Sequence, residues 1–367
     1  MSKLSTTFLS ALLLVGALLA PLPAQRPAPF PEGEAAIEHL LLHYAKPSED
    51  GWLPVYAGLV NALPADVRVT VAVGDEEERE QLVALLRQFH LRMPELLCVD
   101  VPITPWARDR MLALSGASSA TILTPRGEHV ADGYAGDLAV AHGLAEKLLR
   151  VSATMQLEFE GGDVLCSSER VFVGHATIVN NTARLEERAV VRMFAQMLQS
   201  AIVVVGRQGT PHEHADMYLT VLDDKTVALG CPASGAALLR QNSGPLPAFD
   251  TWDEQGQADF ERTYEGVRLE LLRQGLRVVR VPIVHGIEGG VLTWNNCLVE
   301  RRAGVRRVYM PSYGAPALDE AAAAAFQANG CEVIPIDVAE IAADGGTVRC
   351  LTNVVAWRRD AAPRARS

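Results

Sequence analysis

The chain has little basic charge for its size. Its 33 lysines and arginines are outnumbered by 44 aspartates and glutamates, so the formal net charge is −11 over 367 residues. A general nucleic-acid binder needs a basic face that displaces counterions from the phosphates. The charge balance argues against that class, and we expect no nucleic acid among the partners.

Cysteine is also scarce. The chain has six, which are too few to build a disulfide-stabilised scaffold of this length. Hydrophobic residues make up 49% of the chain and charged residues 21%, which excludes a disordered protein and fits a packed globular one. The length is sufficient for one large domain with a substantial core.

One apolar run stands out, at residues 8–20, after the positive charge of Lys3. The run is shorter than the ~20 residues that cross a bilayer, and Pro21 ends it. Ala24 then offers the small residue that signal peptidases accept. The sequence predicts a signal peptide over residues 1–24, a secreted or periplasmic protein, and membrane contact only through this export signal.

The rest of the chain divides by composition. Residues 25–33 contain three prolines and predict a stiff leader. Residues 34–360 are predicted to form a single domain, and residues 361–367 form a short basic tail.

Secondary-structure signals recur along that domain in a fixed order. A strand, a second strand, a helix and a third strand follow one another about five times, and the first unit shares its strands between the two ends of the chain. The predicted strands are 67–73, 96–101, 111–115, 120–124, 155–159, 163–167, 170–174, 201–205, 217–221, 226–229, 276–281, 297–300, 308–311 and 331–336, and the predicted helices are 76–89, 138–151, 185–198, 260–273 and 318–329.

A repeat of this size indicates a closed array of α/β modules. A doubly wound parallel sheet would instead alternate single strands with helices, and no GxGxxG motif follows a strand in this chain. Residues 234–257 form the longest irregular connection, which predicts either a lid over a substrate site or a surface insertion.

Four short motifs combine side chains that can carry chemistry, and each lies beside a predicted strand, where loops on a rigid scaffold often present active groups. Each motif is weak when it stands alone, because a glycine pair is usually a turn and a single cysteine is usually buried and inert. They are Trp-Ala-Arg-Asp at 106–109, Glu-Gly-Gly-Asp at 160–163, His-Glu-His-Ala-Asp at 212–216 and Gly-Gly-Thr-Val-Arg-Cys-Leu-Thr at 345–352.

Together the motifs suit a planar cation. A guanidinium needs carboxylates that accept its paired N–H groups, and Asp109 and Asp216 can supply them. Trp106 can cover the face of the cation.

The same set contains a nucleophile and an acid–base group. Cys350 can attack the central carbon of a guanidinium as a thiolate. His214 can donate a proton to the leaving amine, and Glu160 can orient His214.

In this order, the motifs resemble the agmatine deiminase and bacterial-type peptidylarginine deiminase family of guanidino-group-modifying enzymes. The resemblance covers residues 40–357. It implies a five-module α/β propeller of ββαβ units, pentein-like. It also implies hydrolytic deimination to a ureido product and ammonia through a covalent thiouronium on cysteine, with neither a metal nor a cofactor.

The resemblance also assigns roles residue by residue, with a guanidino small molecule or an arginine-containing peptide as the partner. The segment 293–299 resembles the family segment that contains a site asparagine, which falls on Asn296. The implied catalytic residues are Cys350, His214, Asp216, Asp109 and Glu160, and the implied substrate-binding residues are Trp106, Arg108, Asp163 and Asn296.

The flanks of two motifs depart from the family. Residues 103–105 and 110–111 replace the acidic or amide residues and the Gly-Pro that usually surround Trp-x-Arg-Asp. Arg349 stands before Cys350, where agmatine deiminases usually have histidine. These differences disfavour agmatine as the substrate, and peptidylarginine, free arginine and agmatine all stay open.

Three other functions remain open at the sequence level. His212 and His214 on one face of a strand, with Asp216 and Glu160, would form a metal-dependent hydrolase site. A secreted propeller without catalysis would explain the altered flanks. An amidinotransferase would pass the same adduct on Cys350 to an amine instead of to water.

Overall fold

A computed structural model describes residues 28–29, 31–45, 49–115, 121–127, 134–241, 246, 251, 254–286 and 290–358. The predicted signal peptide and the predicted basic tail lie outside these residues. Within them, no helix is both long enough and apolar enough to cross a membrane.

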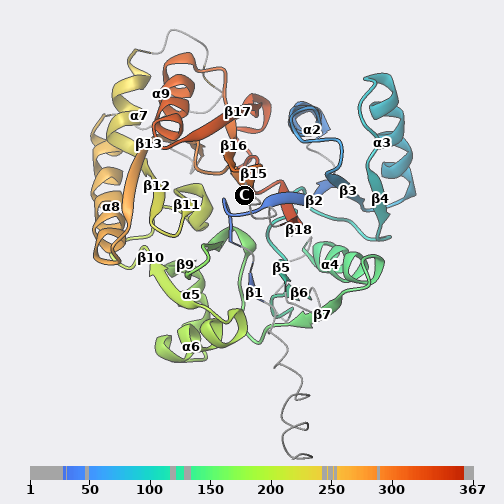
Figure 1. Ribbon diagram of the computed structural model, residues 1–367, viewed down its shortest axis with the longest axis horizontal. Coiled ribbons are helices and arrows are strands. Elements are labelled where there is room, and N and C mark those ends of the chain that lie inside the picture. Colours follow the sequence, from blue (N-terminus) through green and yellow to red (C-terminus); the bar gives the residue numbers. More distant parts are fainter. Residues whose placement is uncertain are drawn as a thin grey trace, which may run out of the picture.

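Five small sheets lie around a common centre, with their helices on the outside (Figure 1). Each sheet repeats one pattern, in which an antiparallel pair is followed by a helical crossover to a parallel strand. In one of them β5 (Leu112–Ser115) pairs antiparallel with β6 (Thr121–Thr124), and α4 (Ala135–Lys147) leads to β7 (Val151–Thr154), which is parallel to β6.

Three further sheets follow the same order along the chain. Their elements are β8 (Val164–Cys166), β9 (Arg170–Gly174), α5 (His175–Thr182), α6 (Glu187–Leu198) and β10 (Ala201–Val205); β11 (Leu219–Asp223), β12 (Thr226–Cys231), α7 (Pro232–Leu239), α8 (Glu254–Arg273), β13 (Arg277–His285) and the added β14 (Val291–Thr293); and β15 (Leu298–Arg302), β16 (Val305–Ser312), α9 (Pro316–Gln327) and β17 (Cys331–Asp337).

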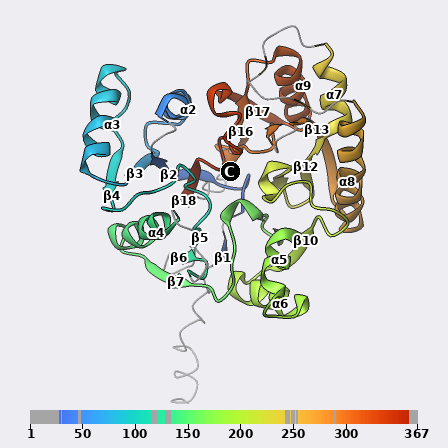
Figure 2. The ribbon, with the colours of Figure 1, turned by 180° about the vertical axis from the view of Figure 1, so that it is seen from behind.

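The remaining sheet joins the beginning of the domain to its end. The late strand β18 (Thr352–Arg358) pairs antiparallel with β2 (Ala36–Tyr44), and β2 is parallel to β3 (Arg68–Val73) across α2 (Glu49–Ala62). Both views show β2 and β18 side by side near the centre (Figure 2). The predicted α/β class, the five modules and the unit shared between the chain ends are confirmed.

Helix α3 (Glu76–Gln88) and β4 (Glu95–Cys98) complete that sheet on its outer side. Asp75 caps α3, because its carboxylate accepts a hydrogen bond from the backbone N–H of Glu78. Buried apolar side chains fill the spaces between sheets and helices, so each module holds its loops at the centre in place.

The second half of the predicted leader is built into the fold. β1 (Ala28–Pro29) pairs with β5, and the backbone N–H of Glu32 donates to the carbonyl of Cys166 at 3.0 Å. Residues 28–29 and 32 therefore belong to the folded domain, which was predicted to begin only at residue 34.

The strand predicted at 155–159 is wrong. The strand of this module is β7, and α4 ends four residues earlier than predicted, at Lys147. Residues 155–159 alternate buried and less buried side chains, which imitates a strand, but the N–H of Glu158 donates to the side chain of Asn181 at 3.0 Å instead of to a neighbouring strand. Asn181 belongs to α5, a helix that the sequence analysis did not predict.

The irregular connection predicted at 234–257 is helical at both ends, since α7 covers its start and α8 begins at Glu254. Gly235 in α7 has a packing reason. A Cβ on Gly235 would lie 1.9 Å from the carbonyl oxygen of Ile283, so only glycine lets α7 approach β13 this closely.

Candidate active site

Cys350 lies in the turn that precedes β18, and only 3% of its surface is exposed. The side-chain amide of Asn296 organises this turn. Its oxygen accepts hydrogen bonds from the backbone N–H groups of Thr347, Arg349 and Cys350 at 3.2, 3.0 and 3.1 Å, and its nitrogen lies 3.0 Å from Sγ of Cys350. Asn296 thus fixes both the backbone and the thiol of the candidate nucleophile.

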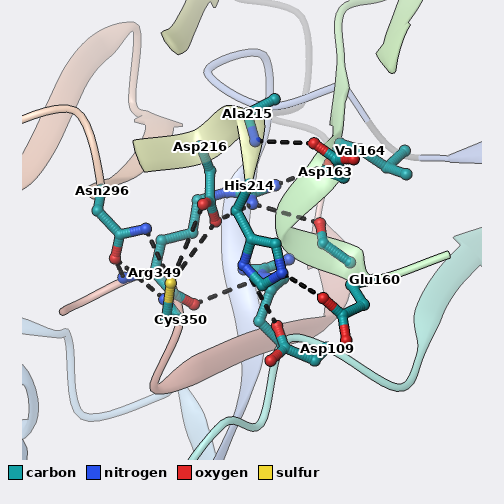
Figure 3. Close-up of polar contacts among 12 residues, drawn as sticks. Asp109, Glu160, Asp163, Val164, His214, Ala215, Asp216, Asn296, Arg349 and Cys350 are labelled. Carbon is teal, nitrogen blue, oxygen red and sulfur yellow. Dashed lines mark hydrogen bonds and ion pairs between the residues drawn. The ribbon is translucent and has the colours of Figure 1, made fainter. Parts of the chain in front are cut away.

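His214 stands next to this thiol, between two carboxyl groups (Figure 3). Its Nε2 lies 2.5 Å from Oε2 of Glu160, and its Nδ1 lies 4.0 Å from Oδ1 of Asp109. Glu160 is also paired with Arg110, with 2.8 Å between Nη2 and Oε1. The predicted orientation of His214 by Glu160 matches this geometry.

The two carboxyl groups favour a charged imidazole. Burial lowers the pKa of His214, but Asp109, the hydrogen bond with Cys350 and the hydrogen bond with Glu160 outweigh burial and raise the pKa well above its usual value. Burial raises the pKa of the Glu160 carboxyl group. The opposing effect of His214 and Arg110 is larger, so the pKa of Glu160 lies below its usual value. Both shifts favour an imidazolium beside a carboxylate.

Asp109 is buried, and its carboxyl group is not fully satisfied by hydrogen bonds. Its Oδ1 accepts no hydrogen bond. Burial, together with the negative charges of Glu160 and Asp216, raises the pKa of Asp109 to about 7. A buried carboxyl oxygen without a donor is suited to an incoming cation.

Asp216 lies on the 3-10 turn η2 (Ala215–Met217) and is fully buried. Its Oδ2 accepts a hydrogen bond from Nη1 of Arg349 at 2.7 Å. Both carboxyl oxygens lie 4.0 Å from Sγ of Cys350. Burial and the charge of Asp216 raise the pKa of the Cys350 thiol to about 11, although His214 acts in the opposite direction.

A cavity of about 290 Å³ opens above these groups. Trp106 is half-buried in its wall, beside Gly346, where a Cβ would lie 2.7 Å from the indole ring. The residues that line this cavity are Trp106, Asp109, Tyr134, Glu160, His212, Glu213, His214, Asp344, Gly345 and Cys350. A second cavity of about 390 Å³ shares Glu160, Glu213 and His214 with it and extends to Arg110 and Thr177.

Two residues predicted to bind substrate have other contacts. Arg108 is buried behind the nucleophile turn, where its backbone N–H donates to the carbonyl of Cys350 at 3.2 Å and its Nε lies 3.4 Å from the carbonyl oxygen of Arg349. Asp163 accepts hydrogen bonds from the N–H groups of Ala215 and Thr177 at 2.9 and 3.1 Å. Arg108 therefore supports the cysteine turn, and Asp163 anchors the turn that carries Asp216.

The metal site predicted on one strand face is wrong in its geometry, because residues 212–216 bend into η2 instead of forming a strand. Nδ1 of His212 accepts a hydrogen bond from the backbone N–H of His214 at 3.1 Å. Within the described residues, the groups with metal-ligand spacing are His214 with Asp216 and Cys350, and His214 with Asp109 and Glu160; neither includes His212.

The sequence analysis missed two charged residues of this centre. Arg349 was treated only as a departure from the family, and Glu32 was placed in the leader. The guanidinium of Arg349 is 2% exposed and pairs with Glu32 at 2.6 Å as well as with Asp216. An arginine directly before a buried cysteine is a usable signal, because a buried guanidinium requires carboxylate partners.

Comparisons with known proteins agree with this fold. Agmatine deiminase of C. jejuni is 15% identical to the chain, with a TM-score of 0.69, and the match covers 92% of this chain and 98% of that one. Agmatine deiminase of Enterococcus faecalis is 14% identical, with a TM-score of 0.65 and coverage of 90% and 95%. At these identities the likeness establishes the fold alone. None of the curated proteins matches the chain.

The sequence profile of one family spans most of the domain. It matches residues 43–355 and is described as Porphyromonas-type peptidyl-arginine deiminase. This range contains every residue of the cavity wall. The chain therefore belongs to the Porphyromonas-type peptidyl-arginine deiminase family.

Proposed function

We propose that this protein hydrolyses the guanidino group of arginine in peptides to a ureido group and ammonia, with Cys350 as the nucleophile. The observation that carries the proposal is the meeting of four groups at one place. The Cys350 thiol, the His214 imidazole and the buried carboxyl group of Asp109 line one cavity, and the buried carboxyl group of Asp216 lies 4.0 Å from the thiol sulfur. Together they suit a planar cation.

Binding follows from the charges. The free oxygen of Asp109 and Oδ1 of Asp216 accept N–H groups of the guanidinium in charge-assisted hydrogen bonds. Trp106 flanks the cation. The cation offsets the negative charges that raise the pKa of Asp109, so substrate binding ionises this carboxyl group.

The same cation activates the nucleophile. In the free site the Cys350 thiol keeps its proton, because burial and Asp216 raise its pKa to about 11. A bound guanidinium reverses the second of these effects and favours the thiolate, so the thiol releases its proton to solvent. Activation thus depends on the substrate.

The reaction has two stages. The thiolate sulfur forms a bond to the guanidinium carbon, and the C–N bond to the departing nitrogen breaks as His214 donates its proton, so ammonia leaves and a thiouronium remains. His214, now neutral, takes a proton from water, whose oxygen attacks the thiouronium carbon. The C–S bond breaks, the hydroxyl proton passes to solvent, the ureido product leaves and the thiolate is restored.

The nucleophile is tested by Cys350→Ser and Cys350→Ala. We expect both variants to fold with unchanged melting temperature and to lose deimination, measured as ureido product. A solved relative is a cysteine-to-serine variant of C. jejuni agmatine deiminase with substrate bound, which supports the choice of serine. Retained turnover in either variant would refute the covalent route, and product formed only when an amine acceptor is added would identify an amidinotransferase.

The substrate class follows from the predicted export. An exported enzyme is separated from cytoplasmic agmatine, whereas arginine in peptides is abundant outside the cell. We would compare kcat/KM for agmatine, free arginine, and arginine inside and at the C-terminus of peptides. A preference for agmatine of ~10-fold or more, about 1.4 kcal/mol of transition-state binding, would overturn the peptidylarginine assignment. No turnover of any of the four would favour a protein without catalysis.

A further inference from the structure

The guanidinium of Arg349 is held by two carboxylates that are far apart in the sequence. Its Nη1 donates to Oδ2 of Asp216 at 2.7 Å, and its Nη2 donates to Oε1 of Glu32 at 2.6 Å. The carbonyl oxygen of Val164 accepts a further bond from Nη2 at 3.0 Å. The side chains of Arg349, Asp216 and Glu32 are 2%, 0% and 11% exposed, so solvent screens this network little.

Glu32 is held firmly in that position by its own segment. Its N–H bonds to the carbonyl of Cys166 in β8, and the N–H of Gly33 bonds to the carbonyl of Val299 in β15. Gly33 has a φ of 71°, and a Cβ there would lie 2.5 Å from the carbonyl oxygen of Leu222 in β11. The segment is therefore bonded to strands of two sheets and packed closely against a strand of a third, which holds Glu32 beside Arg349.

The N–H donors of the Arg349 guanidinium are shared between the two carboxylates. Nε and Nη2 face Glu32 and only Nη1 faces Asp216, so Arg349 takes only one oxygen of Asp216. The other oxygen stays beside the sulfur of Cys350, at 4.0 Å. A buried guanidinium with a single carboxylate partner would bind both of its oxygens, because bidentate pairing is the preferred geometry of such pairs.

We propose that Glu32 is a positioning residue of the active site, which shares the guanidinium of Arg349 and so leaves one oxygen of Asp216 available to the substrate cation. The inference rests on the proposed guanidino chemistry. It makes the segment that follows the predicted export signal a working part of the site. Without Glu32, Arg349 takes over Asp216 and cation recognition weakens.

The test measures cation recognition without turnover. Chloroacetamidine carries a positive charge and chloroacetamide does not, and both alkylate a thiol. We would measure both rate constants at Cys350 by peptide mass analysis and take their ratio. In the unaltered protein we expect the cationic reagent to react faster. In Glu32→Gln we expect this ratio to fall ~10-fold or more, which corresponds to about 1.4 kcal/mol, with a much smaller change for chloroacetamide.

Two further variants separate positioning from stability. Glu34→Gln is the matched control, because it neutralises a half-buried glutamate of the same segment whose charge partners are Arg301 and Arg306 instead of Arg349. It should keep the ratio. Glu32→Leu with Arg349→Met removes the competing cation together with its second partner and should restore the ratio, because Arg349 then takes neither oxygen of Asp216.

Each outcome decides between the claims. An unaltered protein without preference for the cationic reagent would overturn both the guanidinium site and the role of Glu32. A preference that persists in Glu32→Gln would overturn only the role of Glu32. Should Glu32→Gln fail to fold, the paired variant decides, since a low ratio in a folded Glu32→Leu/Arg349→Met protein contradicts the competition for Asp216.

Discussion

The buried charge of Asp109, which is proposed to bind the substrate cation, is expected to lower the stability of the folded protein. Because the folded pKa of Asp109 is about 7 and the usual value is 3.8, the folded state binds the extra proton between these pH values. Stability therefore falls as pH rises through this window, and the whole cost is present above pH 7. We predict that Asp109→Asn abolishes deimination and stabilises the protein at pH 8 by up to about 4 kcal/mol.

Urea unfolding of both proteins at pH 4 and pH 8 provides the measurement. The stabilising effect of Asp109→Asn should nearly vanish at pH 4, where the carboxyl group is protonated in the folded protein. An equal gain at both pH values would show that charge burial is not its source.

The two histidines of the His-x-His segment are expected to differ sharply. His214 contacts Glu160 and neighbours Asp109, whereas burial and the charge of His214 lower the pKa of His212 to about 4. We predict that His214→Ala reduces kcat by ~10²-fold or more, the usual contribution of a general acid, while His212→Ala changes it several-fold at most. Steady-state kinetics, combined with metal analysis of each purified variant, checks this. Equal losses in both variants, with bound metal in the parent protein, would revive the metal-dependent hydrolase.

Residue types in the sequence predicted which side chains gather at the candidate active site, but only part of the contacts that these side chains make. The motifs containing Cys350, His214 and Asp109 could be found because each residue type carries a recognisable chemistry. The exclusion of Arg108 from the cavity wall could not, because an arginine next to an aspartate has the same sequence signature whether it points to a substrate or to a backbone carbonyl.

At the level of elements, the Glu-Gly-Gly-Asp turn η1 (Gly161–Asp163) controls how close two parts of the site approach. A Cβ on Gly162 would lie 2.6 Å from Nδ1 of His214, and a Cβ on Gly161 would lie 2.1 Å from the carbonyl oxygen of Arg108. The first neighbour is a side chain of the site, and the second is backbone. The two glycines should therefore respond differently to the same substitution.

We predict that Gly162→Ala displaces the imidazole and lowers kcat/KM by ~10²-fold with little loss of stability, since misplacement by about 1 Å has such an effect. Gly161→Ala should destabilise the fold by about 1–3 kcal/mol, the usual cost of overpacking. Thermal unfolding and kinetics on the two variants form a matched pair. Similar melting temperatures with similar activities would contradict the distinction.

The elements with strong periodicity were predicted well, and those shaped by side-chain contacts were not. β9 and β10 match their predicted ranges because β-branched and aromatic side chains favour strands: β9 has two valines around a phenylalanine, and β10 has a continuous run of isoleucine and valine. α5 was missed because its segment is short and contains two asparagines and two threonines, which usually favour turns. Its Asn181 is buried and bonded to the backbone of Glu158, a long-range contact without a local signal.

At the scale of the whole molecule, export remains a prediction that concerns residues outside those described. We expect the mature protein from its native host to begin near Gln25, because Ala24 follows the apolar run. N-terminal sequencing decides this, and an intact Met1 or Ser2 would contradict it. A start near Gln25 keeps Glu32, so the proposed positioning residue would remain after cleavage.

The pairing of β18 with β2 has a consequence for how the protein is made. The contact between Glu32 and Arg349 spans 317 residues, and such nonlocal contacts form late and slowly in folding. During synthesis β2 emerges early and waits with an open edge until β18 follows. The nucleophile turn lies just before that final strand. A partly synthesised chain thus lacks both its closing strand and Cys350, so the proposed activity would require that synthesis of the domain is finished.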